Sequence, residues 1–240
     1  MPRFAALFLL FAAASTAGLA QPEVSFGADL VSRYVWRGFD FGQSAAAQPY
    51  IELTSGDFTV GTWGSFGISD ASSNELDLYA SYAFGPITVG VTDYYFPTDA
   101  PDIGVTGGSD YFNFDDGGDG AHYIEPFVSY DGGDAIPLGI TIAPMLYNDP
   151  EFSTYIEAST GFEVSGVELG LALGSLVVLD EDDVDGSALY GTSKTATVTN
   201  IMLSAGREIP ITDQFSLPVF GQYIVNPETE RAFLLFGISL

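Results

Sequence analysis

The sequence predicts an all-β fold, a transmembrane antiparallel up-and-down β-barrel of about 12 strands. Apolar and polar residues alternate with a period of two along most of the chain, which is typical of strands that have one apolar face. Most of these alternating runs are near the roughly 9 to 11 residues that a tilted strand needs to cross a bilayer, which is long for an ordinary globular strand. After Ala20 we find no convincing amphipathic helix and no long apolar run, so a transmembrane helix is not expected.

Alternation is clearest in 57–69, 74–84, 151–164 and 167–179, where one face is apolar and the other is small or polar. The complete set of predicted strands is 24–38, 45–54, 57–69, 74–84, 86–96, 121–131, 138–148, 151–164, 167–179, 196–208, 213–225 and 229–240. Pro126, Pro144 and Pro218 fall inside three of them, where each removes a backbone donor and so counts against a strand interior.

The predicted connections alternate between short and long. "SGD" at 55–57, "GP" at 85–86 and "SG" at 165–166 are tight turns, whereas 97–120 and 180–195 are long and rich in Asp and Gly. Short turns on the periplasmic side and long loops outside are typical of outer-membrane barrels. In hydrocarbon only a closed sheet leaves no unpaired edge, so this pattern favours a barrel over a secreted β-sandwich.

The N-terminus has the features of a secretory signal peptide over residues 1–20. A positive charge at Arg3 precedes an apolar core from Phe4 to Ala14, and Gly18 and Ala20 are small residues at the expected cleavage site. We therefore expect an exported chain whose residues 21–240 form one barrel domain in the bacterial outer membrane, surrounded by outer-membrane lipid.

The composition excludes several classes of function. The chain has 32 acidic residues against six Lys and Arg and a net charge of −26, so no nucleic-acid partner is expected. It has no cysteine and one histidine, which excludes disulfides, thiolate metal sites and sites that need two imidazoles.

Two acidic segments, "FDDGGDG" at 114–120 and "DEDDVDG" at 180–186, superficially resemble calcium loops. A twelve-residue EF-hand loop starting at Glu181 would need Glu at its last position, which is Thr192, so an EF-hand is rejected. Loosely bound Ca²⁺ stays open, with weak candidate ligands at Asp115, Asp116, Asp119, Asp182, Asp183 and Asp185. We expect no other cofactor.

Two of the six basic residues fall within "VSRYVWRG" at 31–38. If 24–38 is one strand, Tyr34 and Trp36 face lipid while Arg33 and Arg37 face the lumen, because arginine at mid-depth on the lipid face would cost about 2 to 4 kcal/mol. The same alternation places acids in the lumen at Asp29, Glu52, Glu75, Asp77 and Glu157. The pairing of arginine with carboxylate would form either a structural salt-bridge network that fills a narrow barrel or a charged constriction that selects solutes.

Aromatic residues near predicted strand ends indicate a girdle at the membrane–water boundary. The residues concerned are Tyr34, Trp36, Tyr94 to Phe96, Tyr147, Tyr155 and Tyr190.

The segment "DLVSRYVWRGFDFG" at 29–42 resembles the early strand of the TorF family of bacterial outer-membrane porins. That family has a Ser-x-Tyr-x-x-Arg-Gly pattern, which Ser32, Tyr34, Arg37 and Gly38 match. The resemblance is specific over about 15 residues and implies an outer-membrane β-barrel, but it supplies no substrate and no catalytic residue.

The leading hypothesis is a porin through which small polar solutes or ions diffuse with a weak cation preference. The alternatives are a closed structural or adhesive barrel with calcium-binding acidic loops, and an outer-membrane lipid hydrolase. The hydrolase would use His122 with Ser109 or Ser129 and Glu125, but His122 and Glu125 point to opposite faces of a strand. The sequence therefore predicts a protein without enzymatic activity, and it does not indicate the solute or the oligomeric state.

Overall fold

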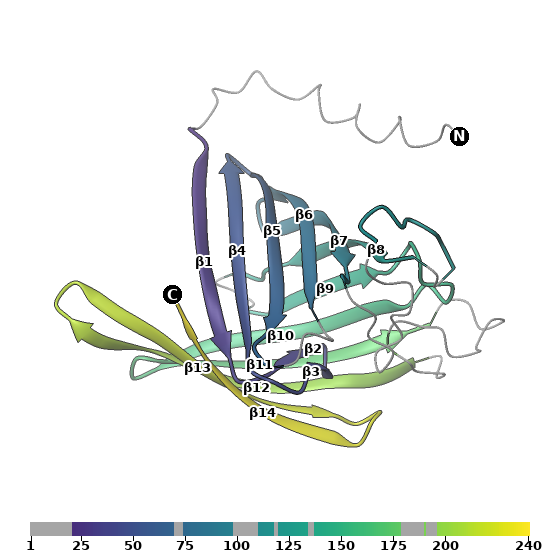
Figure 1. Cartoon of the computed structure of the whole chain (residues 1–240). Coiled ribbons are helices and arrows are strands. Elements are labelled where there is room, and N and C mark those ends of the chain that lie inside the picture. The colour runs from purple at the N-terminus through teal and green to yellow at the C-terminus, as the bar shows by residue number, and fades with distance from the viewer. Residues whose placement is uncertain are drawn as a thin grey trace.

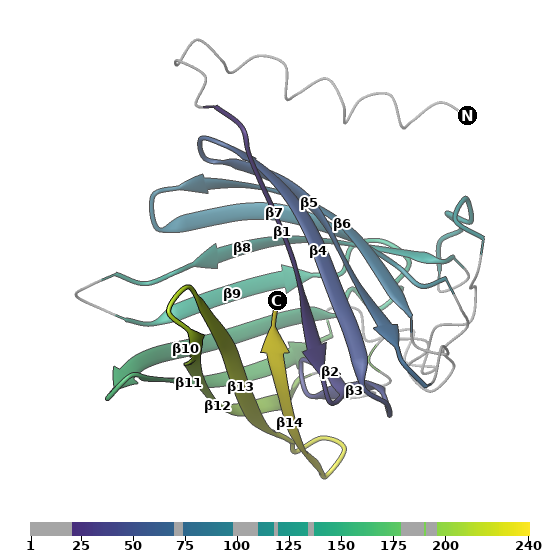
Figure 2. The ribbon, with the colours of Figure 1, turned by 60° about the vertical axis from the view of Figure 1, so that its left-hand side comes forward.

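The computed structural model describes residues 21–69, 74–97, 110–117, 120–133, 137–178, 190 and 196–240. Twelve antiparallel strands close into a barrel in the order β1-β14-β13-β12-β11-β10-β9-β8-β7-β6-β5-β4, and β2 and β3 form a separate two-stranded sheet (Figures 1 and 2). The predicted barrel and its strand number are confirmed. The predicted signal peptide at 1–20 lies outside the described residues.

The wall strands agree closely with the alternating runs of the sequence. They are β1 Glu23–Val31, β4 Ala46–Ser55, β5 Phe58–Gly67, β6 Glu75–Phe84, β7 Ile87–Tyr95, β8 His122–Tyr130, β9 Gly139–Pro144, β10 Thr154–Val164, β11 Val167–Val177, β12 Ala196–Thr212, β13 Phe215–Asn226 and β14 Arg231–Ser239. The main departure is the first strand, which ends at Val31 rather than at residue 38. The inner sheet consists of β2 Tyr34–Trp36 and β3 Phe39–Gly42.

The two ends of the barrel differ in their connections. The short-turn rim has two-residue turns at 56–57, 85–86, 165–166 and 213–214, together with the longer connection 131–138. The long-loop rim has the connections 32–45, 68–74, 96–121, 145–153, 178–195 and 227–230. The first strand begins at the short-turn rim and the last strand runs towards it, and Leu240 exchanges backbone hydrogen bonds with Ala28 in the middle of β1.

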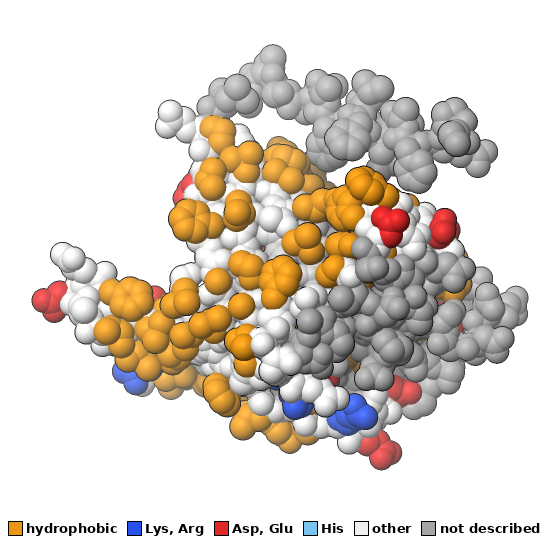
Figure 3. All heavy atoms as spheres, in the orientation of Figure 1, with side chains coloured by type: hydrophobic (Ala, Val, Ile, Leu, Met, Phe, Trp, Pro, Cys, Tyr) orange, Lys and Arg blue, Asp and Glu red, His pale blue; other side chains and the backbone are white. Residues whose placement is uncertain are grey.

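The outer face of the wall is apolar, as the alternation requires. Exposed large hydrophobic side chains recur along the outer face of β1, β7, β10 and β12, including Phe26, Val89, Ile156 and Leu203. Hydrophobic side chains spread over the strands in the view of Figure 3. In the part of the chain that is described, no helix is long and apolar enough to cross a membrane.

Each of the three prolines lies where its strand has a paired neighbour on one side only. Pro126 is in β8, which pairs with β9 only from Val128 to Tyr130. Pro144 is the last residue of β9, and Pro218 lies just before the part of β13 that pairs with β14. The missing N–H of proline loses no ladder hydrogen bond on the side that has no partner, which explains why these strands tolerate proline.

Candidate functional site

The segment that continues the first predicted strand leaves the wall and folds into the barrel. β2 and β3 form a hairpin in which Trp36 pairs with Phe39, and its two-residue turn is Arg37-Gly38 with φ of +52° and +87°. Positive φ at both central residues is the geometry of a type I′ turn, whose twist matches that of paired strands. Residues 34–42 are called the inner hairpin below; its strands lie near the lower end of β1 in Figure 1.

Gly38 fits the inner hairpin against the wall. A Cβ built on it would lie 1.8 Å from the carbonyl oxygen of Thr199 on β12, so no larger residue fits without movement of the backbone. The side-chain amide of Asn226 on β13 donates to the Gly38 carbonyl at 3.1 Å. The hairpin tip is therefore seated directly on β12 and β13.

Aromatic side chains fill the lumen around the inner hairpin. Trp36 stacks on Tyr190 at 5.5 Å and packs against Tyr94 at 5.3 Å, while Tyr34 packs against Trp63 at 5.5 Å. The buried members of the cluster are Tyr34, Phe41, Tyr94, Phe96, Tyr123, Ala143, Met145, Tyr155, Leu176 and Tyr190. These residues come from the hairpin, from the five wall strands β7 to β11 and from the long-loop rim, so the cluster fills the end of the barrel next to that rim.

This cluster corrects the predicted aromatic girdle. Tyr34 and Trp36 do not face lipid, because the chain turns inward after Val31. Tyr94, Phe96, Tyr155 and Tyr190 are likewise part of the lumenal cluster. Tyr95 and Tyr147 lie outside it; Tyr95 stacks on His122 at 4.9 Å, and Tyr147 bridges to Ile124.

Arg37 is the charged centre of the inner hairpin. Its guanidinium donates to both carboxylate oxygens of Glu125 on β8, at 2.6 and 2.8 Å, and to the Tyr190 hydroxyl at 2.5 Å. It also lies over the rings of Trp36 and Tyr155, at 4.2 and 4.3 Å from their centroids. The side chains of Arg37 and Glu125 are only 11% and 2% exposed, so this is a buried bidentate ion pair. The predicted inward direction of Arg37 agrees with this geometry, although its partner was not among the predicted acids.

Arg33 has a different environment. It pairs at 3.4 Å with Asp40 of β3, and its side chain is 36% exposed. Its guanidinium also lies 5.8 Å from the centroid of the Phe233 ring. Arg33 is thus a partly solvated link between the start and the second strand of the inner hairpin, and the two arginines do not line one constriction together.

Two predicted lumenal acids lie beneath the inner hairpin. Glu75 and Asp77, two residues apart on the inner face of β6, are 2% and 6% exposed. The Tyr34 hydroxyl donates to Glu75 Oε1 at 3.2 Å. Glu75 Oε2 and Asp77 Oδ1 are buried and have no hydrogen-bond donor among the described residues. This acid pair is thus close to the inner hairpin, but neither carboxylate forms an ion pair with an arginine of the described residues.

The remaining predicted acids lie at other points of the inner face. Tyr79 donates to Glu52 at 2.8 Å, and Tyr155 donates to Glu157 at 2.5 Å. Asp29 shares the inner face of β1 with Ser25, which donates to Glu52 at 3.3 Å. Glu52 and Glu157 are thus each satisfied by a tyrosine hydroxyl, and these acids do not converge on the ion pair of Arg37.

His122 lies on the opposite face of β8 from Glu125. Its ring is fully buried, with Nδ1 2.9 Å from Asp93 and Nε2 2.7 Å from the Tyr111 carbonyl, and the Phe114 ring stacks on it at 3.9 Å. Asp93 and the rim residues 111–114 therefore enclose this histidine. The structure does not bring it together with Glu125, and Ser109 lies outside the described residues.

The weak calcium candidates are only partly described. Asp115 and Asp116 are exposed on the long-loop rim, and Asp116 accepts from the backbone N–H of Asn148 at 2.9 Å. Asp119, Asp182, Asp183 and Asp185 lie outside the described residues. Among the residues that are described, no group of three or more His, Cys, Asp or Glu is arranged to hold a metal ion.

Burial perturbs ionisable groups at the long-loop rim. It raises the pKa of Asp149, although backbone N–H groups of Ser153 and Glu151 donate to this carboxylate at 2.9 and 3.3 Å. Burial also raises the pKa of the Tyr190 hydroxyl, which remains a neutral hydrogen-bond partner of Arg37.

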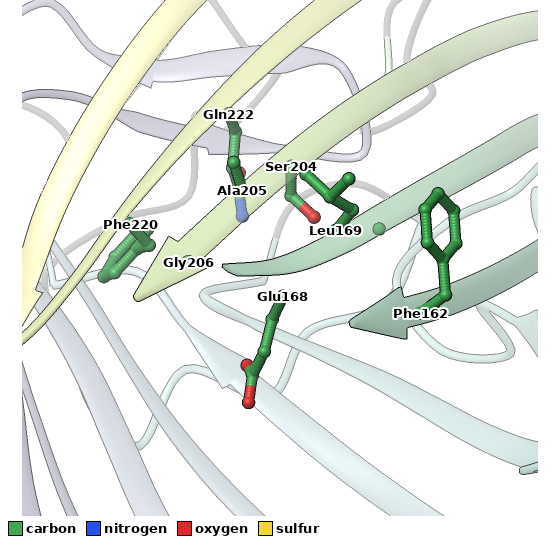
Figure 4. Close-up of a pocket in the computed structure, with 10 residues that line it drawn as sticks. Phe162, Glu168, Leu169, Ser204, Ala205, Gly206, Phe220 and Gln222 are labelled. Carbon is green, nitrogen blue, oxygen red and sulfur yellow. The ribbon is translucent and has the colours of Figure 1, made fainter. Parts of the chain in front are cut away.

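Towards the short-turn rim the wall is lined by small residues. A cavity of about 430 Å³ lies against β10 to β13 and is bordered by Gly170, Gly206, Ser204 and Gln222, with Glu168 and Phe220 at its edge (Figure 4). The barrel is thus filled at one end and more open at the other.

These features define a closed antiparallel β-barrel with an apolar outer surface and a hairpin packed inside it. A family model described as "Bacterial protein of unknown function (Gcw_chp)" matches residues 15–172, and the chain belongs to this family. None of the curated proteins with which the chain was compared matches it significantly.

Proposed function

We propose that this protein is an outer-membrane β-barrel through which small polar solutes or ions diffuse, and that the inner hairpin controls their passage. The observation that carries the proposal is a closed barrel with an apolar outer face, whose lumen is filled at one end by a hairpin that a buried ion pair joins to the wall. Passage then requires this hairpin to move, because its aromatic cluster occupies the lumen.

The charges of the inner face support a weak cation preference. Glu52, Glu75, Asp77 and Glu157 lie on this face, and of the arginines in the described ranges only Arg37 pairs with a carboxylate of the inner wall, that of Glu125. Rings of carboxylates in pores favour cations. The proposal needs no cofactor and no nucleic-acid partner, and loosely bound Ca²⁺ at the acidic loops remains a separate proposal.

The localisation rests on two supports. The resemblance of 29–42 to TorF-family porins implies an outer-membrane barrel, and the exposed side chains of the wall are suited to surrounding lipid. Fractionation of cells tests this directly: the protein should be recovered in the outer membrane and should migrate differently in gels before and after heating. Recovery as a soluble secreted protein would contradict the localisation.

Conductance in planar bilayers tests the function. The wild-type protein should open rarely, whereas Arg37→Ala and a variant with 34–42 replaced by a Gly-Ser linker should open often, because each weakens or removes the plug. Arg33→Ala is the matched control and should resemble the wild type. Absence of conductance in all four proteins, each shown to be a folded barrel, would exclude a pore.

A closed structural or adhesive barrel is the second candidate, and the filled lumen is the observation that favours it. It predicts stabilisation by Ca²⁺ without conductance, even after the hairpin is removed. The proposal includes no enzymatic activity: esterase activity that is lost in His122→Ala would contradict it, and the enclosure of His122 gives that activity no support.

A further inference from the structure

We propose that Glu75 and Asp77 form a proton-binding site that holds one shared proton beneath the inner hairpin. Glu75 and Asp77 lie two positions apart on β6, so their carboxyl groups share one face of the strand, and both side chains are buried. Neither Glu75 Oε2 nor Asp77 Oδ1 has a donor among the described residues, and both atoms are excluded from solvent. Two buried carboxylate oxygens repel each other unless a positive species lies between them, as in carboxyl pairs that share one proton.

The surrounding groups do not provide that positive species. From the inner hairpin, the Tyr34 hydroxyl donates to Glu75 Oε1, and Arg37 is engaged bidentately by Glu125. From β7, the Tyr94 hydroxyl donates to Glu125, and Asp93 interacts with His122. The charged groups that face the acid pair are therefore mostly acidic, and the one guanidinium is already paired.

A proton fits this site better than a metal ion. Ca²⁺ takes six to eight oxygen ligands, and Mg²⁺ requires near-octahedral coordination. The site offers two carboxylates, and no third acid completes a metal cluster in the ranges that the structure describes. Bulk water supplies the proton, which one carboxylate binds and the other accepts as a hydrogen bond.

The shared proton couples the acid pair to the plug, and this consequence rests on the proposed function. Tyr34 connects Glu75 to the hairpin, and loss of the proton leaves two negative charges buried beneath it, which water can reach only when the hairpin undocks. The hairpin should then dock less tightly as the pH rises, and conductance should increase with pH.

Infrared spectroscopy tests the proton site without any need for conductance. The wild-type barrel at neutral pH should show the C=O stretching band of a buried protonated carboxylic acid. Glu75→Gln and Asp77→Asn should each lose this band, because either change removes the sharing partner. Glu52→Gln is the matched control and should keep it, because Glu52 lies on the same face but accepts from Tyr79.

Three outcomes would overturn the site: no protonated-acid band in the wild type, a band that persists in both variants, or a band that appears only after EDTA has removed a divalent cation. The regulatory consequence is tested separately by conductance against pH. Conductance should rise with pH in the wild type, and it should not depend on pH in Glu75→Gln and Asp77→Asn. If the wild type and both variants show the same pH dependence, the acid pair is not coupled to the hairpin. A band with the expected behaviour, but no conductance in any protein, would retain the proton site and reject the pore.

Discussion

Arg37→Ala should release the inner hairpin from the wall. The change removes the bidentate pair with Glu125, the hydrogen bond to Tyr190 and the two ring contacts, and it leaves Glu125 with the Tyr94 hydroxyl at 2.9 Å. Removal of one partner of a buried ion pair typically costs about 3 to 5 kcal/mol, because the remaining charge stays buried. Since about 1.4 kcal/mol corresponds to a factor of ten, the population with an undocked hairpin should rise by about 10²- to 4 × 10³-fold.

Tryptophan fluorescence measures this change directly. The chain has two tryptophans: Trp36 is on the hairpin, and Trp63 is on β5 against Tyr34. In a Trp63→Phe background Trp36 is the single reporter, and exposure of its ring to water should shift its emission to longer wavelength. Urea unfolding of the barrel in vesicles, followed by the same signal, gives the free energy of docking when the hairpin unfolds before the wall.

Arg33→Ala is the control for the loss of a positive charge. The Arg33–Asp40 pair is longer and more exposed, so its removal should cost about 1 kcal/mol or less. In a double-mutant cycle, Arg37→Ala and Glu125→Ala together should cost less than the sum of the two single changes. If Arg37→Ala costs no more than Arg33→Ala and leaves Trp36 emission unchanged, the ion pair does not hold the hairpin.

Three other changes have defined outcomes. Gly38→Ala should expel the hairpin tip and lower the free energy of unfolding by about 3 kcal/mol or more, because its Cβ would lie 1.8 Å from a carbonyl oxygen. Gly56→Ala is the control and should lower it by about 1 kcal/mol, because the space around Gly56 is open. Trp36 emission and urea unfolding measure both effects. Tyr34→Phe should cost about 1 to 3 kcal/mol by leaving Glu75 Oε1 without its donor, as measured by urea unfolding. Burial raises the pKa of Asp149 above its unfolded value of about 3.9. The stabilisation that protonated Asp149 provides is therefore complete below a pH of about 3.9 and is lost as the pH rises through the folded pKa. The free energy of unfolding, measured across this pH range, should fall less steeply in Asp149→Asn than in the wild type.

The alternation of the sequence predicted the wall because its cause is local. Every wall strand has an apolar outer face on one side and the lumen on the other, so successive side chains must alternate in polarity. The same alternation placed Glu52, Glu75, Asp77 and Glu157 on the inner face, as the structure has them. It could not identify Glu125 as the partner of Arg37, because that contact joins residues 88 positions apart.

The alternation of the sequence does not predict the inner hairpin, because it continues beyond Val31, where the pairing of β1 with β4 ends. β4 begins at Ala46, which pairs with Val31, so a strand continued to residue 38 would have no neighbour on that side. An unpaired strand edge is costly, and by turning into the lumen this segment pairs with itself as the inner hairpin. The sequence did contain a local signal, since "YVW" and "FDFG" are two alternating runs separated by the two residues Arg37 and Gly38, the spacing of a tight hairpin.

The same reasoning explains why Tyr34 and Trp36 were assigned to lipid. Side-chain alternation fixes the face of a residue only while the strand remains in the wall, and aromatic residues at strand ends are equally suited to a membrane boundary and to a plug. What distinguishes the two here is the charge that accompanies them. An arginine beside Trp36 can be buried only where a carboxylate and hydroxyls receive it, and those groups lie on the inner face. An aromatic run that is flanked by arginines is therefore better interpreted as part of a hairpin inside the lumen than as an interfacial girdle.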